Sequence, residues 1–255
     1  MRNIKVKVLN PDAIKEARSM MICAARLTQR GEKISNMRDF MQLFCNPFTD
    51  NTVEALCELP HPTIQKFALI NIVVVGASRR FLAQITRHQN EVKFMSASLQ
   101  YSDYSGQAGF VVPYELIDAN MAEAEYISAC QDSMRAYELL AASVGNDAAG
   151  YAAPQGLRNV LIMSATPYQW KHMISQRICR RNTTETRYVM ARIWEALYEL
   201  DPIMFSAKQC GPFCLRDGAC KEGKMCCGDV MTCATPDNLI ATDFPKLWRG
   251  DNNED

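Results

Sequence analysis

Two polar segments of this 255-residue sequence carry side chains that suit an anionic, planar ligand. The first segment is rich in hydrogen-bonding groups and holds Gln84, Arg87, His88, Gln89, Ser96, Ser98, Gln100 and Tyr101. The second is rich in arginine and holds Arg177, Arg180, Arg181, Asn182, Thr184, Glu185 and Arg187. Arginine forks combined with amide and hydroxyl groups bind a phosphate and a hydrogen-bonding ring. If the two segments face each other, they form a cationic pocket for a ligand such as a nucleotide.

Each segment also has a purely structural explanation. The first can be a solvated helix end followed by a polar loop. The second can be a solvated corner between two helices in which Glu185 neutralises the arginines, and the charge pattern alone favours that interpretation. Spacing by itself does not decide between these explanations, because short motifs also match by chance.

Several common catalytic motifs are absent from the sequence. It contains neither a glycine-rich phosphate loop nor a Gly-x-Ser-x-Gly nucleophile motif. Its three histidines, His61, His88 and His172, leave little room for a histidine metal site or a Ser-His-Asp triad. We therefore expect any catalysis to depend on a cofactor that the protein holds and tunes.

Hydrophobic periodicity predicts the elements that position the two segments. Residues 67–76 predict a buried strand that leads into a helix from Arg79. Residues 157–165 predict a second strand, followed by a helix with Thr166 as its N-cap and Pro167 at its first position. The other expected elements are a strand at 2–9, a helix starting at Pro11, a short strand at 110–112, and helices at 118–144 and 184–200. Both polar segments thus follow a strand and a helix, and ligand sites often lie at such element ends.

The composition is that of an ordinary globular protein. Hydrophobic residues make up 48% and charged residues 22%, and the formal net charge is zero. This balance gives no overall electrostatic signal for nucleic-acid binding. The longest apolar run, residues 70–77, is far too short to span a bilayer, and the first residues predict a charged strand rather than a signal peptide. We expect a cytoplasmic protein without membrane or nucleic-acid partners.

The composition changes near residue 206, where a cysteine-rich region begins. We therefore divide the chain into a main domain, residues 1–206, and an extension, residues 207–255. Five cysteines of the extension are candidate metal ligands: Cys210, Cys214, Cys220, Cys226 and Cys227. Four thiolates around zinc would stabilise so small a unit. Because no Cys-x-x-Cys pair is present, free or redox-active thiols and an iron–sulfur cluster remain alternatives.

Arg87-His88-Gln89, followed by the stretch from Ser96 to Ser102, resembles the signature of the flavin-dependent thymidylate synthases. That signature is Arg-His-Arg, a short spacer and Glu-x-Ser-x-Arg, often followed by Tyr-Ser. Further motifs similar to the family's occur in the same order along residues 1–206: Ala25-Arg26-Leu27, His61-Pro62-Thr63, Gln84, Pro154-Gln155, residues 170–177 and Glu185-x-Arg187. The resemblance implies a single α/β (α+β) domain with a central, mostly antiparallel sheet flanked by helices.

The resemblance also implies a reaction. Members of this family convert dUMP to dTMP, with NADPH-reduced FAD as the hydride source and methylenetetrahydrofolate as the carbon donor. They work as homotetramers that hold FAD and dUMP between subunits. The implied substrate-binding residues are Gln84, Arg87, Ser96, Ser98, Gln100 and Arg177, of which Arg177 and Ser98 are the implied catalytic residues. The implied cofactor-binding residues are Thr63, Arg87, His88, Gln89 and Arg181, with a structural role as the alternative for His88.

Several positions depart from the family pattern. Gln89 and Gln100 stand where the family has arginine, and Ser96 stands where it has glutamate. Gly150 falls where an arginine that binds the substrate phosphate is usual, and Arg158 is one candidate to replace it. A charge-assisted hydrogen bond lost without a substitute removes about 1.5–3 kcal/mol. Two alternatives therefore stay open: a related flavoenzyme that alkylates C5 of another pyrimidine nucleotide, and a non-catalytic nucleotide-binding scaffold.

Overall fold

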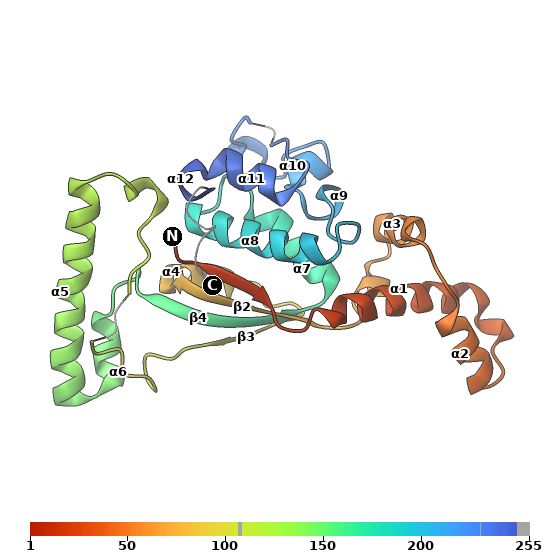
Figure 1. The fold of residues 1–255 in the computed structure, drawn as a ribbon, viewed down its shortest axis with the longest axis horizontal. Coiled ribbons are helices and arrows are strands. Elements are labelled where there is room, and N and C mark those ends of the chain that lie inside the picture. Colours follow the sequence, from red (N-terminus) through yellow and green to blue (C-terminus); the bar gives the residue numbers. More distant parts are fainter. Residues whose placement is uncertain (107–108, 230, 249–255) are drawn as a thin grey trace.

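A four-stranded antiparallel sheet forms the centre of the protein in this computed structural model, which describes residues 1–106, 109–229 and 231–248 (Figure 1). The strands are β1 (Lys5–Val8), β2 (Ile70–Ser78), β3 (Val92–Ser96) and β4 (Arg158–Ala165), in the spatial order β1-β2-β4-β3. All three neighbouring pairs are antiparallel. The predicted mixed α/β class with a central antiparallel sheet flanked by helices is therefore confirmed.

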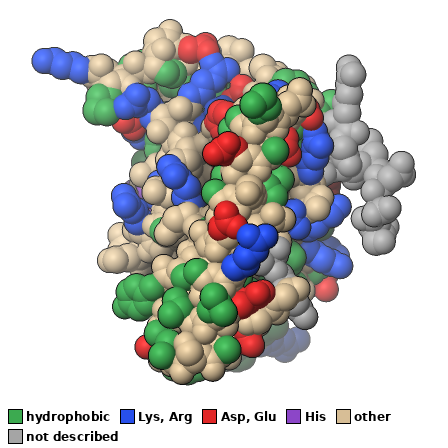
Figure 2. Space-filling view, turned by 90° about the vertical axis from the view of Figure 1, so that its left-hand side faces the viewer, with side chains coloured by type: hydrophobic (Ala, Val, Ile, Leu, Met, Phe, Trp, Pro, Cys, Tyr) green, Lys and Arg blue, Asp and Glu red, His purple; other side chains and the backbone are tan. Residues whose placement is uncertain are grey.

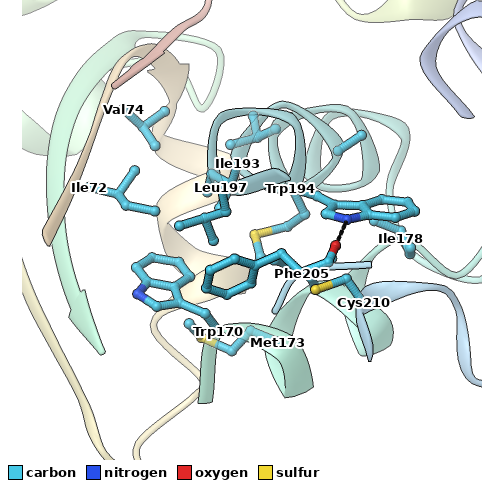
Figure 3. Close-up of a cluster of buried hydrophobic side chains, with 14 of the residues drawn as sticks. Ile72, Val74, Trp170, Met173, Ile178, Ile193, Trp194, Leu197, Phe205 and Cys210 are labelled. Carbon is cyan, nitrogen blue, oxygen red and sulfur yellow. Dashed lines mark hydrogen bonds between the residues drawn. The ribbon is translucent and has the colours of Figure 1, made fainter. Parts of the chain in front are cut away.

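The main core lies between one face of the sheet and two helices, α7 (Pro167–Arg177) and α8 (Thr184–Leu200). Alternate side chains of β2 are fully buried on this face: Ile70, Ile72 and Val74. Trp170 and Trp194 fill the helical side of the same cluster (Figure 3). Both indole N–H groups are satisfied, because Trp170 donates to the Ile70 carbonyl at 3.0 Å and Trp194 to the Phe205 carbonyl at 2.7 Å. Burial of these rings fixes the two helices that carry the second polar segment.

Helix α4 (Arg79–Ile85) follows β2 directly and carries the start of the first polar segment. A bulge at Gly76, with φ of 83°, shifts the register near the end of β2. A Cβ at this position would lie 2.7 Å from the Asn3 carbonyl oxygen, so the close approach of β1 requires glycine. Ser78 then caps the helix by accepting a hydrogen bond from the Phe81 N–H at 3.0 Å.

Helices extend from both ends of the sheet layer (Figure 1). At one end lie α1 (Asp12–Arg30), α2 (Met37–Cys45) and α3 (Asp50–Glu58), and at the other lie α5 (Met121–Val144) and α6 (Asn146–Ala149). Short 3-10 turns link the elements: η1 (Gly31–Lys33), η2 (Pro62–Gln65), η3 (Tyr114–Leu116), η4 (Gly150–Ala152) and η5 (Gly223–Met225). Hydrophobic side chains gather at the α5 end of the molecule (Figure 2). On α5 itself, Leu139 is 75% exposed and Val144 is 64% exposed.

The sheet face opposite α7 and α8 carries no helix among the described residues (Figure 1). Val75, Val160 and Ile162 are each 42% exposed on this face, and Met95 is 73% exposed. Val75 lies opposite Val160, and Ile162 lies opposite Met95, so the four side chains form a continuous apolar stripe across three strands. An apolar stripe of this kind is typical of a surface that contacts another protein.

The described part of the cysteine-rich region packs on the outer side of α8 rather than standing apart (Figure 1). It forms α9 (Ala207–Cys210), α10 (Phe213–Arg216), α11 (Pro236–Asp243) and α12 (Pro245–Trp248). Phe244 is fully buried and packs edge-on against Tyr188, with ring centroids 5.2 Å apart. Asp243 pairs with Arg180 and Arg187. Residues on both sides of the predicted boundary at 206 thus share one hydrophobic core, while the domain division itself stays a prediction.

The structure corrects several predicted element boundaries. β2 begins at Ile70 rather than at residue 67, because Ala68 adopts a positive φ of 64°. The helix expected from Asp118 begins at Met121, since Asp118 and Asn120 have φ values of 64° and 41°. The short strand expected at 110–112 is reduced to a single bridge between Phe110 and Leu157. The loop expected after α4 contains β3, an edge strand that pairs only with β4 in the described sheet. No helix among the described residues is long and apolar enough to cross a membrane.

Candidate functional site

Arg177, the last residue of α7, is the centre of a hydrogen-bond cluster that joins the two polar segments. Its Nε donates to His88 Nε2 at 2.7 Å, and a terminal amino group donates to the Gln84 carbonyl at 3.1 Å. The other terminal amino group donates to Asn182 Oδ1 at 3.2 Å. The guanidinium is therefore held in a fixed orientation between α4 and the start of the loop after α7.

The charge of Arg177 has no carboxylate within ion-pair distance among the described residues. Burial and the nearby charge of Arg87 both lower the pKa of Arg177, although arginine stays protonated in proteins. Glu185 does not neutralise it, because its carboxylate accepts hydrogen bonds from the Ser78 N–H at 2.7 Å and the Ser78 hydroxyl at 2.5 Å. Glu185 therefore does not neutralise Arg177 in the way that the interpretation as a solvated corner expected, and the charge of Arg177 is left without a carboxylate partner among the described residues.

His88 is buried and neutral in this cluster. Burial, the charge of Arg177 and the neighbouring His172 lower the pKa of His88 to about 4. Because Nε2 accepts the hydrogen bond from Arg177, the proton of the neutral ring is on Nδ1. The ring lies edge-on to His172, with centroids 6.5 Å apart. His88 thus contacts two residues of α7: it accepts a hydrogen bond from Arg177 and its ring packs against that of His172.

The lowered pKa of His88 predicts a loss of stability in acid. Folded His88 stays neutral down to pH about 4, whereas the unfolded chain takes up a proton below the ordinary value of 6.5. The unfolded state binds more protons in that window, so the free energy of unfolding should fall as the pH drops from 6.5 towards 4. Replacing His88 by glutamine keeps an acceptor for Arg177 but removes the titration. Urea unfolding of both proteins at several pH values should show that the free energy of unfolding falls more steeply towards acid pH for the wild type than for His88→Gln, and equal slopes would contradict the prediction.

The remaining predicted site residues lie in several places around this cluster. Arg87, Gln89 and Arg181 are exposed, and Thr63 is exposed on η2. Ser96 ends β3, and Ser98 accepts a hydrogen bond from the Gln100 N–H at 3.1 Å in the turn that follows. The structure therefore brings together Gln84, His88 and Arg177, but it does not place Ser98 or Gln100 in a hydrogen bond with them among the described residues.

A cavity of about 920 Å³ lies between η2, α7 and the C-terminal segment. Lys171 is only 4% exposed in its wall, and its Nζ donates to Gln65 Oε1 at 2.8 Å and to Cys57 Sγ at 3.2 Å. No carboxylate lies within ion-pair distance of Lys171 among the described residues. His172 also lines this cavity and connects it to His88. A buried cation with neutral partners suits a ligand that brings negative charge.

The five predicted zinc ligands are not gathered into one site. Cys210 is fully buried in the main core, where burial raises the pKa of its thiol to about 12, whereas Cys226 and Cys227 are exposed. Four of the five line a separate cavity of about 320 Å³, together with Cys179 from the main domain. Within residues 1–106, 109–229 and 231–248, no three histidine, cysteine, aspartate or glutamate residues form a group that could hold a metal ion.

Comparison with known proteins connects this geometry to one family. The family model described as thymidylate synthase complementing protein matches residues 11–203. The chain belongs to this family. A flavin-dependent thymidylate synthase from Pyrococcus abyssi is 25% identical over 172 residues, which cover 65% of this chain and 70% of that protein. A flavin-dependent thymidylate synthase from Clostridium tetani is 23% identical over 249 residues, which cover 88% of this chain and 93% of that protein.

Two solved structures have a fold similar to that of this chain. The UMP/dUMP methylase PolB from Streptomyces cacaoi, bound with 5-Br dUMP, superposes with a TM-score of 0.62 at 16% identity, over 80% of this chain and 94% of that one. ThyX from Helicobacter pylori, with FAD and dUMP, superposes with a TM-score of 0.55 at 14% identity, over 79% and 99%. The membership that the ordered motifs predicted is confirmed, although the signature itself is divergent.

Three residues that line cavities near the Arg177 cluster or beside β3 were not singled out from the sequence: Lys171, His172 and Arg79. Lys171 and His172 follow a buried tryptophan on α7, and nothing in their spacing distinguished them from an ordinary helix surface. The sequence predicts Arg79 only as the first residue of a helix, yet its side chain lines a cavity together with Ser96. The available signal was the pair Arg79-Arg80 directly after an apolar strand, where two adjacent charges flank the first polar segment.

Proposed function

We propose that this protein is a flavin-dependent thymidylate synthase, which methylates C5 of dUMP to give dTMP. The observation that carries the proposal is Arg177, a half-buried cation that His88 and Gln84 hold at the junction of the two polar segments without a carboxylate partner among the described residues. Membership of the family and the flavin-dependent thymidylate synthases among the relatives support the same reaction.

In this proposal Arg177 hydrogen-bonds a carbonyl oxygen of the uracil ring. Negative charge develops on that oxygen as C5 becomes nucleophilic, and a preorganised guanidinium stabilises it. His88, kept neutral by burial, holds the guanidinium in position without competing for the charge. The other nucleotide contacts are assigned to Gln84, Arg87, Ser96, Ser98 and Gln100, with Ser98 as the second catalytic residue.

The large cavity beside α7 fits a phosphate-bearing flavin cofactor. Its buried Lys171 lacks a carboxylate partner among the described residues, and Tyr168, His172 and Phe213 supply aromatic walls. We assign FAD contacts to Thr63, Arg87, His88, Gln89 and Arg181. None of these five lines the cavity itself, although Thr63 lies on η2 between two residues that do. Reduced FAD would supply the hydride, with NADPH and methylenetetrahydrofolate as co-substrates.

The open sheet face supports a homotetramer with shared active sites. The stripe formed by Val75, Val160, Ile162 and Met95 is apolar and exposed, and the outer face of α5 adds further exposed apolar side chains. Ser98 and Gln100 make no hydrogen bond with Arg177 among the described residues, and a nucleotide bound between subunits would bring them to the same ligand. The cytoplasmic location and the zinc ion predicted from the sequence also remain proposals, and metal analysis of the purified protein tests the latter.

The proposed function makes a direct prediction. The purified protein should bind FAD and show flavin absorption, and it should release tritium from C5-labelled dUMP only when methylenetetrahydrofolate and NADPH are both present. Omitting each co-substrate in turn provides the control. A protein that neither binds FAD nor releases tritium would contradict the proposal.

A related enzyme that alkylates C5 of another pyrimidine nucleotide is the second candidate. Ser96 and Gln100 are neutral where the family signature has charged residues, and this favours a substrate with altered contacts. Turnover of dUMP, UMP and dCMP at equal concentration separates the two candidates. Binding of a nucleotide without turnover of any of them would instead support a non-catalytic scaffold.

A further inference from the structure

A cavity of about 490 Å³ lies between α4 and β3, and none of Gln84, His88 and Arg177 lines it. Its polar lining comes from Arg79, Thr86, Ser96 and Gln155. Leu82 and Phe94 supply apolar walls, and both are partly buried against the main core. The cavity thus combines one cation, hydroxyl and amide groups, and an apolar surface within a space of ligand size.

Arg79 is the only residue with a full charge in the lining of this cavity, and one of its terminal amino groups is buried without a hydrogen-bond partner among the described residues. Its backbone N–H donates to the Leu157 carbonyl at 3.0 Å, which ties the start of α4 to the strand beside it. No carboxylate lies within ion-pair distance of Arg79 among the described residues. A buried donor left unpaired is unfavourable, so its presence indicates a ligand that accepts hydrogen bonds and carries negative charge.

The surroundings of Gly150 leave little room for a long side chain at that position. A Cβ at Gly150 would lie 3.3 Å from the Leu99 Cβ, so a long side chain there requires Leu99 to move. Leu99 packs in a small second cluster that also contains Tyr104. Burial raises the pKa of Tyr104 and the charge of Arg79 opposes that rise, which places Arg79 beside the same cluster. Gly150 itself does not line the cavity, so the cation that the cavity contains is the one at Arg79.

We propose that this cavity binds the phosphate group of the pyrimidine nucleotide and that Arg79 is its principal ligand. The inference rests on the proposed function for the identity of the nucleotide, but the phosphate site can be tested separately from turnover. The guanidinium of Arg79 offers the charge and the unpaired donor, and Ser96 and Gln155 add a hydroxyl and an amide. Ser96 thereby takes part in binding without carrying the charge of the glutamate that it replaces.

Arg158 is the competing ligand, and the structure distinguishes it from Arg79. Its Nε is also buried without a partner among the described residues. Its side-chain stem, however, packs near Gly109, where a Cβ would lie 3.1 Å from the Arg158 Cδ, and Arg158 does not line the cavity. Arg80 provides a matched control, because it is an exposed arginine next in sequence that lines a different cavity beside Glu185.

The experiment compares the binding of dUMP and 2′-deoxyuridine by calorimetry to the full-length wild type and to the variants Arg79→Gln, Arg158→Gln and Arg80→Gln. Arg79→Gln should weaken dUMP binding by about 10- to 100-fold and leave deoxyuridine binding unchanged, since only dUMP carries the phosphate. Arg79→Lys should recover part of the loss through its charge. The other two variants should bind both ligands as the wild type does. Thermal unfolding of each variant verifies that it is folded.

Each alternative outcome is decisive. Wild-type affinity of Arg79→Gln for dUMP overturns the phosphate site and leaves the proposed function intact. The same conclusion follows if Arg158→Gln alone loses dUMP, or if Arg79→Gln loses both ligands equally. A wild type that binds dUMP through Arg79 but gives no turnover contradicts the proposed function and keeps the phosphate site. A wild type that binds neither ligand overturns both.

Discussion

Replacing Arg177 by alanine is expected to lower the turnover of dUMP by a factor of about 10²–10³, the loss typical of removing one preorganised electrostatic group. Three neighbours orient the guanidinium, through hydrogen bonds of 2.7 Å to His88, 3.1 Å to the Gln84 carbonyl and 3.2 Å to Asn182. Its charge is not neutralised by a carboxylate among the described residues, so it is available to the anion that develops on the uracil ring. Tritium release from C5-labelled dUMP at saturating substrate measures the effect.

Two companion variants show whether the loss is specific. Arg177→Lys keeps the charge but loses the fork that bonds three neighbours, so its rate should lie between those of the wild type and Arg177→Ala. Gln176→Ala changes an exposed side chain one position earlier on α7 and should retain the wild-type rate. Circular dichroism confirms the fold of each variant. If Arg177→Ala turns over dUMP at the wild-type rate, Arg177 and His88 form a structural cluster and the proposed role is wrong.

The elements with strong local signals were predictable from the sequence. Thr166 and Pro167 mark the start of α7, and the Thr166 side chain accepts a hydrogen bond from the Gln169 N–H at 3.3 Å as an N-cap does. The apolar spacing of α8 gives its bounds correctly at 184–200. β3 was missed because Val92 to Ser96 is short and mixed, and its strand conformation depends on pairing with β4, about seventy residues later in the chain.

The sequence predicted which residues belong to the site better than it predicted how they contact one another. Ordered motifs identified Gln84, His88 and Arg177, but the contact between His88 and Arg177 joins residues 89 positions apart and depends on how α4 packs beside α7. The pair Arg79-Arg80 pointed to charge at the start of α4, but it could not show that a donor of Arg79 is buried and unpaired, because that is a property of packing rather than of sequence. Cys210 shows the reverse case: its place in a cysteine-rich run indicated a metal ligand, whereas the fold buries its thiol beside Phe205 and Trp194 (Figure 3).

Replacing Phe244 by alanine is expected to destabilise the whole protein by about 3–5 kcal/mol, the usual loss for a fully buried phenylalanine. Phe244 packs edge-on against Tyr188 of α8 and against Tyr114, with ring centroids 5.2 Å and 5.7 Å away. The preceding Asp243 pairs with Arg187, whose guanidinium lies 5.2 Å from the Phe244 ring centroid. Loss of the ring therefore leaves a cavity in the main core and loosens an ion pair that is nearly buried. Urea unfolding monitored by circular dichroism measures the change.

The same experiment tests whether residues beyond 206 fold independently. Because Phe244, Leu239 and Ile240 belong to the core that also contains Ile72 and Trp194, we expect one unfolding transition for the wild type and one, at lower urea concentration, for Phe244→Ala. Met225→Ala provides the control, since Met225 lies in the same segment but is 57% exposed, and surface changes usually alter stability by less than about 0.5 kcal/mol. Two separate transitions, with only the weaker one shifted by Phe244→Ala, would instead make the cysteine-rich region an independent unit that contributes nothing to the stability of α8.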